Sequence, residues 1–173
     1  NTLSALAVIS IYKNIFKLNE NIFLNFKIPG GRGDHSVVKI DNKKINLIDQ
    51  SYNSNPLSLK SAIKNYDKIE SKTSKKYLLI GDMLELGSHS KKLHQSIAPI
   101  INQTKIDKVF VKGKMASIIF ANISKAKKGK ILSNNSQIIE LIRKDLNNND
   151  YLMIKASLAT GFNDIVKDLK GLH

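Results

Sequence analysis

Short apolar runs alternate with stretches of helical periodicity over most of the chain, and this alternation constrains the fold more than any other feature. The runs at 77–80, 109–111 and 151–154 are too short for helices, and small or polar residues follow each of them. Between the runs, apolar residues recur at the three- and four-residue spacing of amphipathic helices. The alternation predicts a doubly wound α/β fold with a mostly parallel sheet.

The same periodicity predicts the individual helices. Asn55 and Pro56 stand at the N-cap and first-turn positions of a helix that reaches Ile69. A second helix is expected to run through Leu93, Ile97 and Ile101. The pattern also predicts a helix at 114–122, a short strand at 130–132, a helix capped by Ser136, and a last helix at 161–170.

The N-terminal part predicts a β-hairpin preceded by a hinge. Two apolar runs, 37–40 and 45–48, flank four turn residues, which is typical of antiparallel strands. Proline and three glycines crowd the end of the segment 17–35, the best position for a domain boundary. Residues 2–16 have the pattern of a buried helix. Because the chain begins with Asn rather than Met, we expect it to belong to a longer protein.

The net charge of +14 raises an alternative function, a stand-alone basic α/β module that binds nucleic acid. Only two of the 28 basic residues are Arg, the residue preferred for bidentate contacts with phosphates and bases. The lysines are also spread along the whole sequence. We therefore favour a solvated lysine surface, and the alternative predicts steeply salt-dependent binding to DNA or RNA.

Composition excludes several other classes of protein. The chain has no Cys, which excludes a disulfide framework, a Cys-ligated metal site and a Cys nucleophile. No apolar run approaches the 18 residues of a membrane span, and no signal peptide is visible, so we expect a cytoplasmic protein without membrane contacts. His89 and His94 are five residues apart and lack the spacing of a zinc site, so no metal site is predicted.

Three polar segments follow predicted strands, at the sheet edge where ligands of such folds bind. The Asp49–Asn55 segment precedes a helix N-terminus suited to phosphate or carboxylate, or is a turn with an asparagine cap. Asp82 and Glu85 are suited to water-bound Mg²⁺ or a substrate ammonium group, or belong to a solvated loop that caps the next helix. Lys155 with Ser157 is suited to an anion, or is a snorkelling lysine. We expect the three segments to converge.

Arg32 is the fourth candidate, because it is a single guanidinium among flexible glycines. Such a side chain can be brought to a phosphate when domains close, or it can be an ordinary linker residue. The sequence lacks a Gly-x-x-x-x-Gly-Lys-Ser/Thr phosphate loop, a Gly-x-Gly-x-x-Gly fingerprint and a Gly-x-Ser-x-Gly elbow. The chain by itself therefore has no recognisable catalytic apparatus.

Five segments, in order, resemble the C-terminal part of the Mur ligase family, in the branch that adds D-alanyl-D-alanine. The segment 49–58 (Asp-Gln-Ser-Tyr-Asn-Ser-Asn-Pro-Leu-Ser) resembles that branch's Asp-Asp/Glu-Ser-Tyr-Asn-Ala-Asn-Pro-x-Ser. The segment 81–87 (Gly-Asp-Met-Leu-Glu-Leu-Gly), followed by Ser90 and His94, resembles Gly-Asp-Met-x-Glu-Leu-Gly…Ser-x-x-x-His. The remaining similarities are Asn1–Ala7, Gly31–Gly33 and Met153–Ser157.

The resemblance implies an ATP-dependent, Mg²⁺-assisted ligase of peptidoglycan precursor synthesis. It implies joining of D-alanyl-D-alanine to UDP-N-acetylmuramoyl-tripeptide through an acyl phosphate. Family members have a UDP-sugar domain, a central ATPase domain with the phosphate loop, and a C-terminal Rossmann-like domain. Residues 1–30 would then be the helical tail of the central domain and 31–173 the C-terminal domain. The chain alone is expected to be inactive, with its own N-terminal and central domains as partners.

The resemblance also implies roles for individual residues. Nucleotide contacts are implied for Asn1, Arg32, Asp49, Tyr52, Asn53 and Asn55. Substrate contacts are implied for Asp82, Glu85, Lys155 and Ser157, with Arg32 and Lys155 catalytic. Three positions depart from the family pattern: Gln50 replaces an acid that contacts ribose, Ala156 replaces Gly, and Phe162 replaces a frequent Met.

Overall fold

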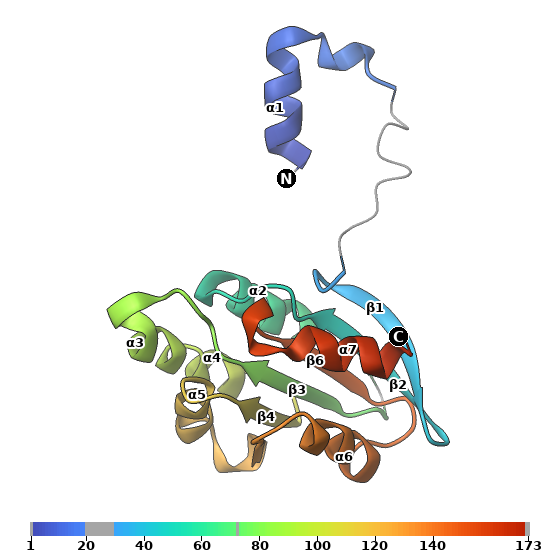
Figure 1. The fold of residues 1–173 in the computed structure, drawn as a ribbon, viewed down its shortest axis with the longest axis vertical. Coiled ribbons are helices and arrows are strands. Elements are labelled where there is room, and N and C mark those ends of the chain that lie inside the picture. The colour runs from blue at the N-terminus through green and yellow to red at the C-terminus, as the bar shows by residue number, and fades with distance from the viewer. Residues whose placement is uncertain (1, 20–29, 72, 172–173) are drawn as a thin grey trace.

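A computed structural model describes residues 2–19, 30–71 and 73–171. Within these ranges, six strands form one sheet in the order β1-β2-β6-β3-β4-β5. The strands are β1 (Asp34–Ile40), β2 (Lys43–Gln50), β3 (Lys76–Gly81), β4 (Lys108–Lys112), β5 (Lys128–Ile131) and β6 (Tyr151–Lys155). β1 and β2 form an antiparallel hairpin, and every other pairing is parallel. Figure 1 shows the arrangement. The predicted hairpin and mostly parallel sheet are confirmed.

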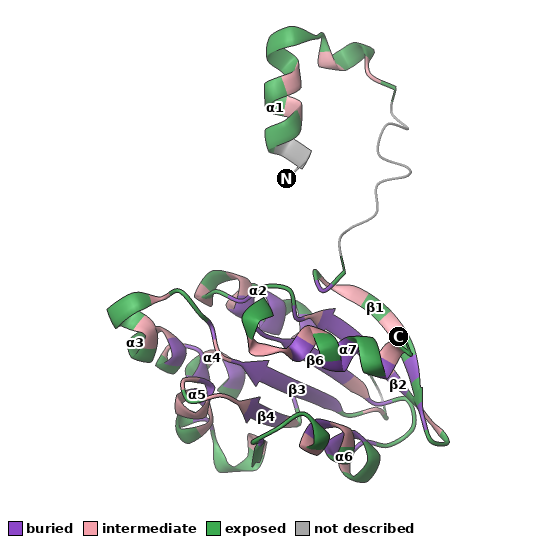
Figure 2. Cartoon of the chain, viewed as in Figure 1, coloured by how far each residue is buried: buried purple, intermediate pink, exposed green. Residues whose placement is uncertain are grey.

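Helices cover both faces of the sheet, as a doubly wound fold requires. These helices are α2 (Pro56–Asp67), α3 (Ser90–Gln95), α4 (Ala98–Asn102), α5 (Ala116–Asn122), α6 (Ser136–Asp145) and α7 (Phe162–Lys170). α1 (Thr2–Tyr12) precedes them, and its described residues belong to neither apolar cluster of the core. One apolar cluster joins α2, α4 and α5 to Leu78, Val109 and Met153. The other joins α6 and α7 to Leu79, Phe110 and Ile154. Because side chains alternate along a strand, the four central strands β2, β6, β3 and β4 contribute to both clusters, and their interiors are buried (Figure 2).

Three helix predictions need correction. The helix expected through Leu93 and Ile101 is broken into α3 and α4, because Pro99 cannot donate a backbone hydrogen bond and lies in the first turn of α4. The helix expected over 2–16 ends at Tyr12. There the Asn14 side chain accepts from the backbone N–H of Phe16, 3.0 Å away, and starts a short 3₁₀ turn. Ser136 is the first residue of α6 rather than its cap, and the Asn134 side chain accepts from Gln137 instead.

None of the described helices is long and apolar enough to cross a bilayer. α1 has an apolar sequence, but its side chains are not covered by the rest of the described chain. Ile11 is 74% exposed, Tyr12 is 83% exposed, and Phe16 just beyond the helix is 92% exposed. The prediction that α1 is a buried helix is therefore not met within these residues.

Candidate functional site

Three polar segments converge at the carboxyl edge of the sheet, because β2, β6 and β3 are neighbours in it. The segment after β2 contacts the segment after β6 through Ser157, whose Oγ donates to the carbonyl of Ser54 at 3.3 Å. The segment after β3 also contacts Ser157. The backbone N–H of Leu84 donates to Ser157 Oγ at 3.1 Å, and Ser157 N–H donates to the carbonyl of Asp82. The predicted convergence is confirmed, and Ser157 is the residue that links all three segments.

Lys155, the last residue of β6, is buried at this edge. It is 2% exposed, and its ammonium donates a hydrogen bond to the carbonyl of Asn53. Loss of solvation by burial lowers the pKa of Lys155 to about 8. The amine is therefore partly neutral slightly above neutral pH, which is unusual for lysine and typical of groups that take part in chemistry.

A hollow of about 250 Å³ lies in front of Lys155. Its walls come from the loop 30–33 before β1 (called the hinge loop below), the segment after β2, the start of α2, and β6. The lining residues are Gly31, Arg32, Gln50, Tyr52, Asn53, Asn55, Ser58 and Lys155. Five predicted site residues thus share one hollow, although they are up to 123 positions apart in the sequence.

The start of α2 forms one wall of this hollow. The Asn55 side chain accepts from the N–H of Ser58 at 2.8 Å, and the Ser58 hydroxyl accepts from the N–H of Asn55 at 3.1 Å. This reciprocal capping box, with Pro56 in the first turn, fixes where the helix begins. The predicted asparagine cap is confirmed, and the remaining free N–H groups of the first turn favour an anion.

Arg32 reaches the hollow from the hinge loop. Its guanidinium lies 4.3 Å from the centre of the Tyr52 ring, a cation–π contact. Gly31 allows this approach, because its φ is +79° and a Cβ there would be 2.9 Å from the backbone nitrogen of Tyr52. Arg32 itself is exposed, so its donors remain accessible to an anion.

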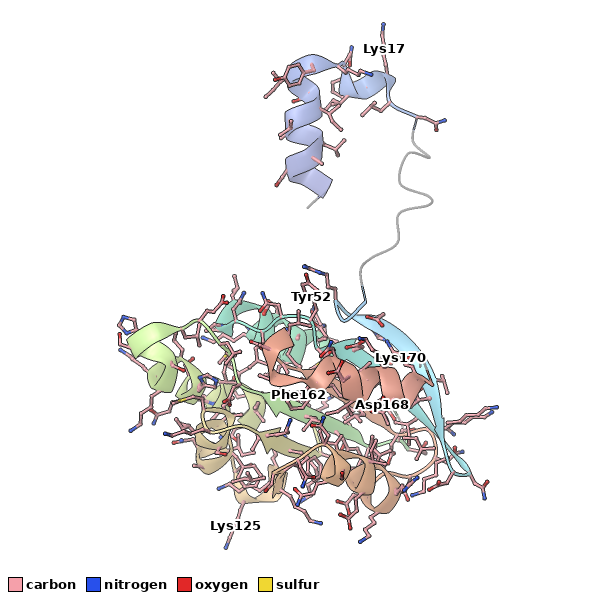
Figure 3. The ribbon with its side chains drawn as sticks, viewed as in Figure 1. Lys17, Tyr52, Lys125, Phe162, Asp168 and Lys170 are labelled. Carbon is pink, nitrogen blue, oxygen red and sulfur yellow. The ribbon has the colours of Figure 1, made fainter. Side chains whose placement is uncertain are left out.

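A partly buried ion triad, Lys170 with Asp34 and Asp49, lies beside the hinge loop. Lys170, on α7, donates to Asp34 and, at 3.0 Å, to Asp49. Burial works against charge at Asp34, but the hydrogen bonds from Lys170 and Gly31 outweigh it and hold the pKa of Asp34 below its usual value. Burial likewise opposes charge at Lys170, but the two carboxylates raise its pKa. Tyr52 and Lys170 are labelled in Figure 3.

Several predicted site residues lie outside the hollow. Asp49 is buried, and its carboxylate contacts Ser51 and Lys170. Asp82 accepts from the N–H of Ala116 at 2.7 Å at the start of α5, and exposed Glu85 has a φ of +61°. Ser157 lies behind the hollow, and Asn1 is outside the described residues. Asp82 therefore bonds the first residue of α5, whereas the next helix along the chain, α3, has no side-chain cap among the described residues, so the predicted capping of the next helix is wrong.

Two of the three positions that depart from the family pattern, Ala156 and Phe162, pack in the core against Gly81. Ala156 is fully buried, and its methyl group faces Gly81 within the core rather than the hollow. Phe162 packs at the same point, where a Cβ on Gly81 would be 2.6 Å from its ring. Gly81 thus provides the space for both larger side chains. Gln50 lines the hollow, so this substitution changes the wall itself.

Sequence reasoning missed Asp34, Ser58 and Lys170. Ser58 carried a readable signal, since its spacing from Asn55 is that of a capping box. Asp34 and Lys170 carried none, because one follows a glycine-rich turn and the other is one of many lysines. Their pairing depends on α7 packing against β1.

The profile of the family described as "Mur ligase, glutamate ligase domain" matches residues 36–158. This chain belongs to the Mur ligase family. The matched residues include most of the hairpin, all the parallel strands and the segments that meet at Ser157. The family assignment expected from the five sequence segments is confirmed.

Curated Mur ligases are similar over most of this chain. The UDP-N-acetylmuramoyl-tripeptide–D-alanyl-D-alanine ligase of Bacillus subtilis is 31% identical over 146 residues, which are 83% of this chain and 31% of the relative. The enzyme of the same name from Buchnera aphidicola subsp. Acyrthosiphon pisum is 36% identical over 126 residues, 71% of this chain and 26% of the relative. The chain thus spans about a third or less of these relatives.

Solved Mur ligases share the fold. The MurF ligase of Thermotoga maritima, determined in complex with ADP, has a TM-score of 0.69 and 22% identity, covering 96% of this chain and 36% of that one. MurF of Acinetobacter baumannii has a TM-score of 0.71 and 18% identity, covering 95% of this chain and 35% of that one. Both similarities support the mostly parallel α/β architecture.

Proposed function

We propose that this chain is the C-terminal domain, with a preceding helix, of an ATP-dependent ligase that joins D-alanyl-D-alanine to UDP-N-acetylmuramoyl-tripeptide. The names of the similar curated enzymes support the reaction and its substrates. The ADP complex of the Thermotoga maritima enzyme supports use of a nucleotide. The observation that carries the proposal is the hollow in which Arg32 and Lys155 meet at the start of α2.

In this proposal, Arg32 binds the phosphates of ATP. Its guanidinium is exposed, stacked on Tyr52, and borne by a loop next to the start of α2. A planar cation that can form two parallel hydrogen bonds suits a phosphate whose charge changes during transfer. Asn53 and Asn55 add amide groups on the same wall, and we assign them and Tyr52 to the nucleotide. Asp49 supports this wall through Ser51.

Lys155 and Ser157 are assigned to the substrate side. The Lys155 amine lies at the back of the hollow, where it donates to a carbonyl, and no carboxylate of the described residues forms an ion pair with it. Such a group stabilises negative charge that develops on an oxygen when an amine attacks an activated carboxyl group. Ser157 holds the segments around Lys155 together, and Asp82 and Glu85 form the adjacent loop.

Residues 1–30 and the Mg²⁺ that accompanies ATP belong, in this proposal, with the central domain. We assign residues 1–30 to the central ATPase domain, which agrees with the exposed apolar side chains of α1. Within the described ranges, no three His, Cys, Asp or Glu side chains gather to hold a metal ion. We therefore propose that the Mg²⁺ that accompanies ATP is held by the central domain. We also propose, from the names of the similar enzymes, that the reaction takes place in the cytoplasm.

The test is the rate of amide formation by the intact ligase that carries this chain. Arg32→Ala and Lys155→Ala should each lower the rate by about 100-fold, since each removes a donor aimed at developing charge. Arg143→Ala is the matched control, because this exposed arginine pairs with Asp41 away from the hollow and should leave the rate unchanged. Near-normal rates for the first two variants would remove their assigned roles, and an intact protein that forms no amide from these substrates would overturn the proposal.

A further inference from the structure

We propose that Lys170 is a positioning residue that holds Arg32 in place, although it lies outside the hollow. The inference rests on the proposed function insofar as it assigns Arg32 to the phosphates. Lys170 is the last residue of α7, 138 positions from Arg32 in the sequence. Its side chain is only 15% exposed, so it is an internal group and not one of the many solvated lysines.

Lys170 bridges the two carboxylates that hold the two sides of the Arg32 contact. Asp34 uses one oxygen for Lys170 and the other for the N–H of Gly31, at 2.7 Å. Asp49 likewise uses one oxygen for Lys170 and the other for the N–H and hydroxyl of Ser51, at 3.0 and 2.7 Å. Gly31 precedes Arg32, and Ser51 precedes the tyrosine on which Arg32 stacks. One ammonium therefore fixes both partners of the cation–π contact.

Backbone hydrogen bonds complete this arrangement. The N–H of Gly33 donates to the carbonyl of Asp49 at 2.7 Å, and the N–H of Tyr52 donates to the carbonyl of Gly31 at 3.1 Å. Both bonds join the hinge loop to the end of β2. Both bonds require the hinge loop and the end of β2 to lie side by side, and the ion triad enforces this geometry.

The charges explain why removal of Lys170 should matter. The Asp49 side chain is 6% exposed and the Asp34 side chain 35% exposed, so water can screen their mutual repulsion only partly. With Lys170 present, both carboxylates have a shared cation. Without it, two neighbouring negative charges face each other, and the hinge loop separates from β2 to relieve the repulsion. Arg32 then loses its fixed position over Tyr52.

The first experiment measures amide hydrogen exchange in the intact protein that carries this chain. Lys170→Met should raise the exchange rates of Gly31, Gly33 and Tyr52 at least about tenfold, because their hydrogen bonds depend on the triad. Lys170→Arg should preserve slow exchange, since it keeps the cation. Lys144→Met is the matched control: it removes an ion-paired lysine from the last turn of α6, where Lys144 contacts Glu140. Unchanged exchange in Lys170→Met would overturn the proposal.

The second experiment separates positioning from a general loss of structure. Lys170→Met should lower amide formation by about 10- to 100-fold in the otherwise unchanged ligase, the cost of a displaced catalytic group. In an Arg32→Ala background it should lower the rate no further, because the group that it positions is already gone. An equal loss in both backgrounds would contradict the proposal.

A further variant keeps the test decisive if Lys170→Met does not fold. Lys170→Gln keeps a polar side chain but removes the cation between the two carboxylates, so faster loop exchange is expected even if Lys170→Met fails to fold; unchanged exchange in this variant would overturn the proposal. If the intact protein forms no amide, the proposed function fails, whereas the exchange measurements still decide whether Lys170 holds the loop.

Discussion

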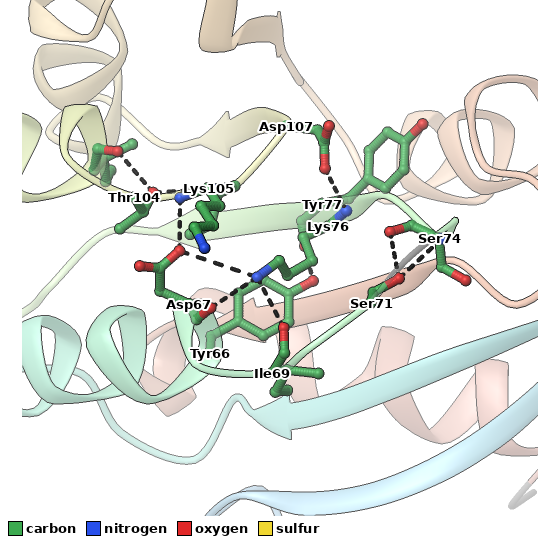
Figure 4. A network of polar contacts seen from close by, with 12 residues as sticks. Tyr66, Asp67, Ile69, Ser71, Ser74, Lys76, Tyr77, Thr104, Lys105 and Asp107 are labelled. Atoms are coloured by element: carbon green, nitrogen blue, oxygen red, sulfur yellow. Dashed lines mark hydrogen bonds and ion pairs between the residues drawn. The ribbon is translucent and has the colours of Figure 1, made fainter.

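Two buried lysines at opposite edges of the sheet show how differently one fold treats the same side chain. Lys76 begins β3 at the amino edge, and Lys155 ends the neighbouring strand β6 at the carboxyl edge. Lys76 donates to the carbonyls of Asp67 and Ile69 at 2.8 and 3.0 Å, and the Asp67 carboxylate is 4.0 Å away (Figure 4). Lys155 contacts the Asn53 carbonyl, and burial lowers its pKa to about 8.

The contacts of the two lysines indicate which of them contributes to the stability of the fold. At the amino edge, the end of α2 wraps around the ammonium and supplies carbonyl groups that would otherwise be unpaired. At the carboxyl edge, the ammonium keeps capacity for more hydrogen bonds and opens onto a hollow. A fully satisfied buried lysine stabilises a fold, whereas an incompletely satisfied one costs stability and is available to a ligand.

The largest effect on stability is expected at the amino edge. Lys76→Met should lower the free energy of unfolding by about 3 kcal/mol, because it leaves two carbonyls without their donor and removes the cation beside the Asp67 carboxylate. Urea denaturation followed by circular dichroism measures this. Lys75→Met, at the exposed neighbouring position, should change the free energy by less than about 0.5 kcal/mol. A small effect of Lys76→Met would erase the contrast between the two edges.

A smaller effect of opposite sign is expected at the carboxyl edge. Lys155→Met should raise the free energy of unfolding by about 2 kcal/mol at pH 7, because burial of the charged amine costs more than the lost Asn53 hydrogen bond contributes. Urea midpoints of the variant and the wild-type protein at pH 7 provide the measurement. Destabilisation by Lys155→Met at pH 7 would contradict the comparison.

The gain from Lys155→Met should depend on pH in a definite direction. Between the folded pKa of about 8 and the ordinary value of 10.5, the unfolded chain binds more protons at Lys155 than the folded one. The stability of the wild-type protein contributed by this group therefore rises with pH across that window. The advantage of the variant should be complete below pH 8 and shrink towards pH 10. An advantage that grows with pH would exclude a buried amine with a lowered pKa.

The smallest effect is expected where the carboxyl edge is itself well satisfied. Asn55→Ala should lower the free energy of unfolding by about 1 kcal/mol, because it removes one half of the capping box of α2. Leu57→Ala, in the same turn, is the control: its side chain is 78% exposed and should matter little. Urea denaturation again provides the measurement, and equal effects of the two variants would argue against the cap.

The general fold and the convergence of the site were predictable because both follow from local pattern. Short apolar runs and helical spacing are set by which faces are buried, and parallel strands bring their carboxyl ends to one edge. The segments that meet at Ser157 could therefore be named from the sequence. The cap at Asn55 was predictable for the same reason, since its partners lie within three residues.

Features that depend on long-range packing were not predictable. The pairing of Lys170 with Asp34 and Asp49 requires α7 to lie against β1, and nothing in a lysine-rich helix marks one lysine as internal. The burial of Ala156 depends in the same way on Gly81, which lies on a neighbouring strand.

The early end of α1 has a local cause instead. The Asn14 side chain offers the backbone an alternative hydrogen-bond partner, which ends the helical pattern before residue 16.

The position of β6 has a consequence for the order in which the chain is made. β6 lies between β2 and β3, so the hairpin and the β3-β4-β5 unit share no strand pairing until residues 151–155 have been synthesised. Until then, β2 and β3 are both open edges, which invite pairing with other chains. Lys155 arrives on the strand that closes this gap. A growing chain therefore completes its sheet and its hollow in a single late step, during which a chaperone has most to protect.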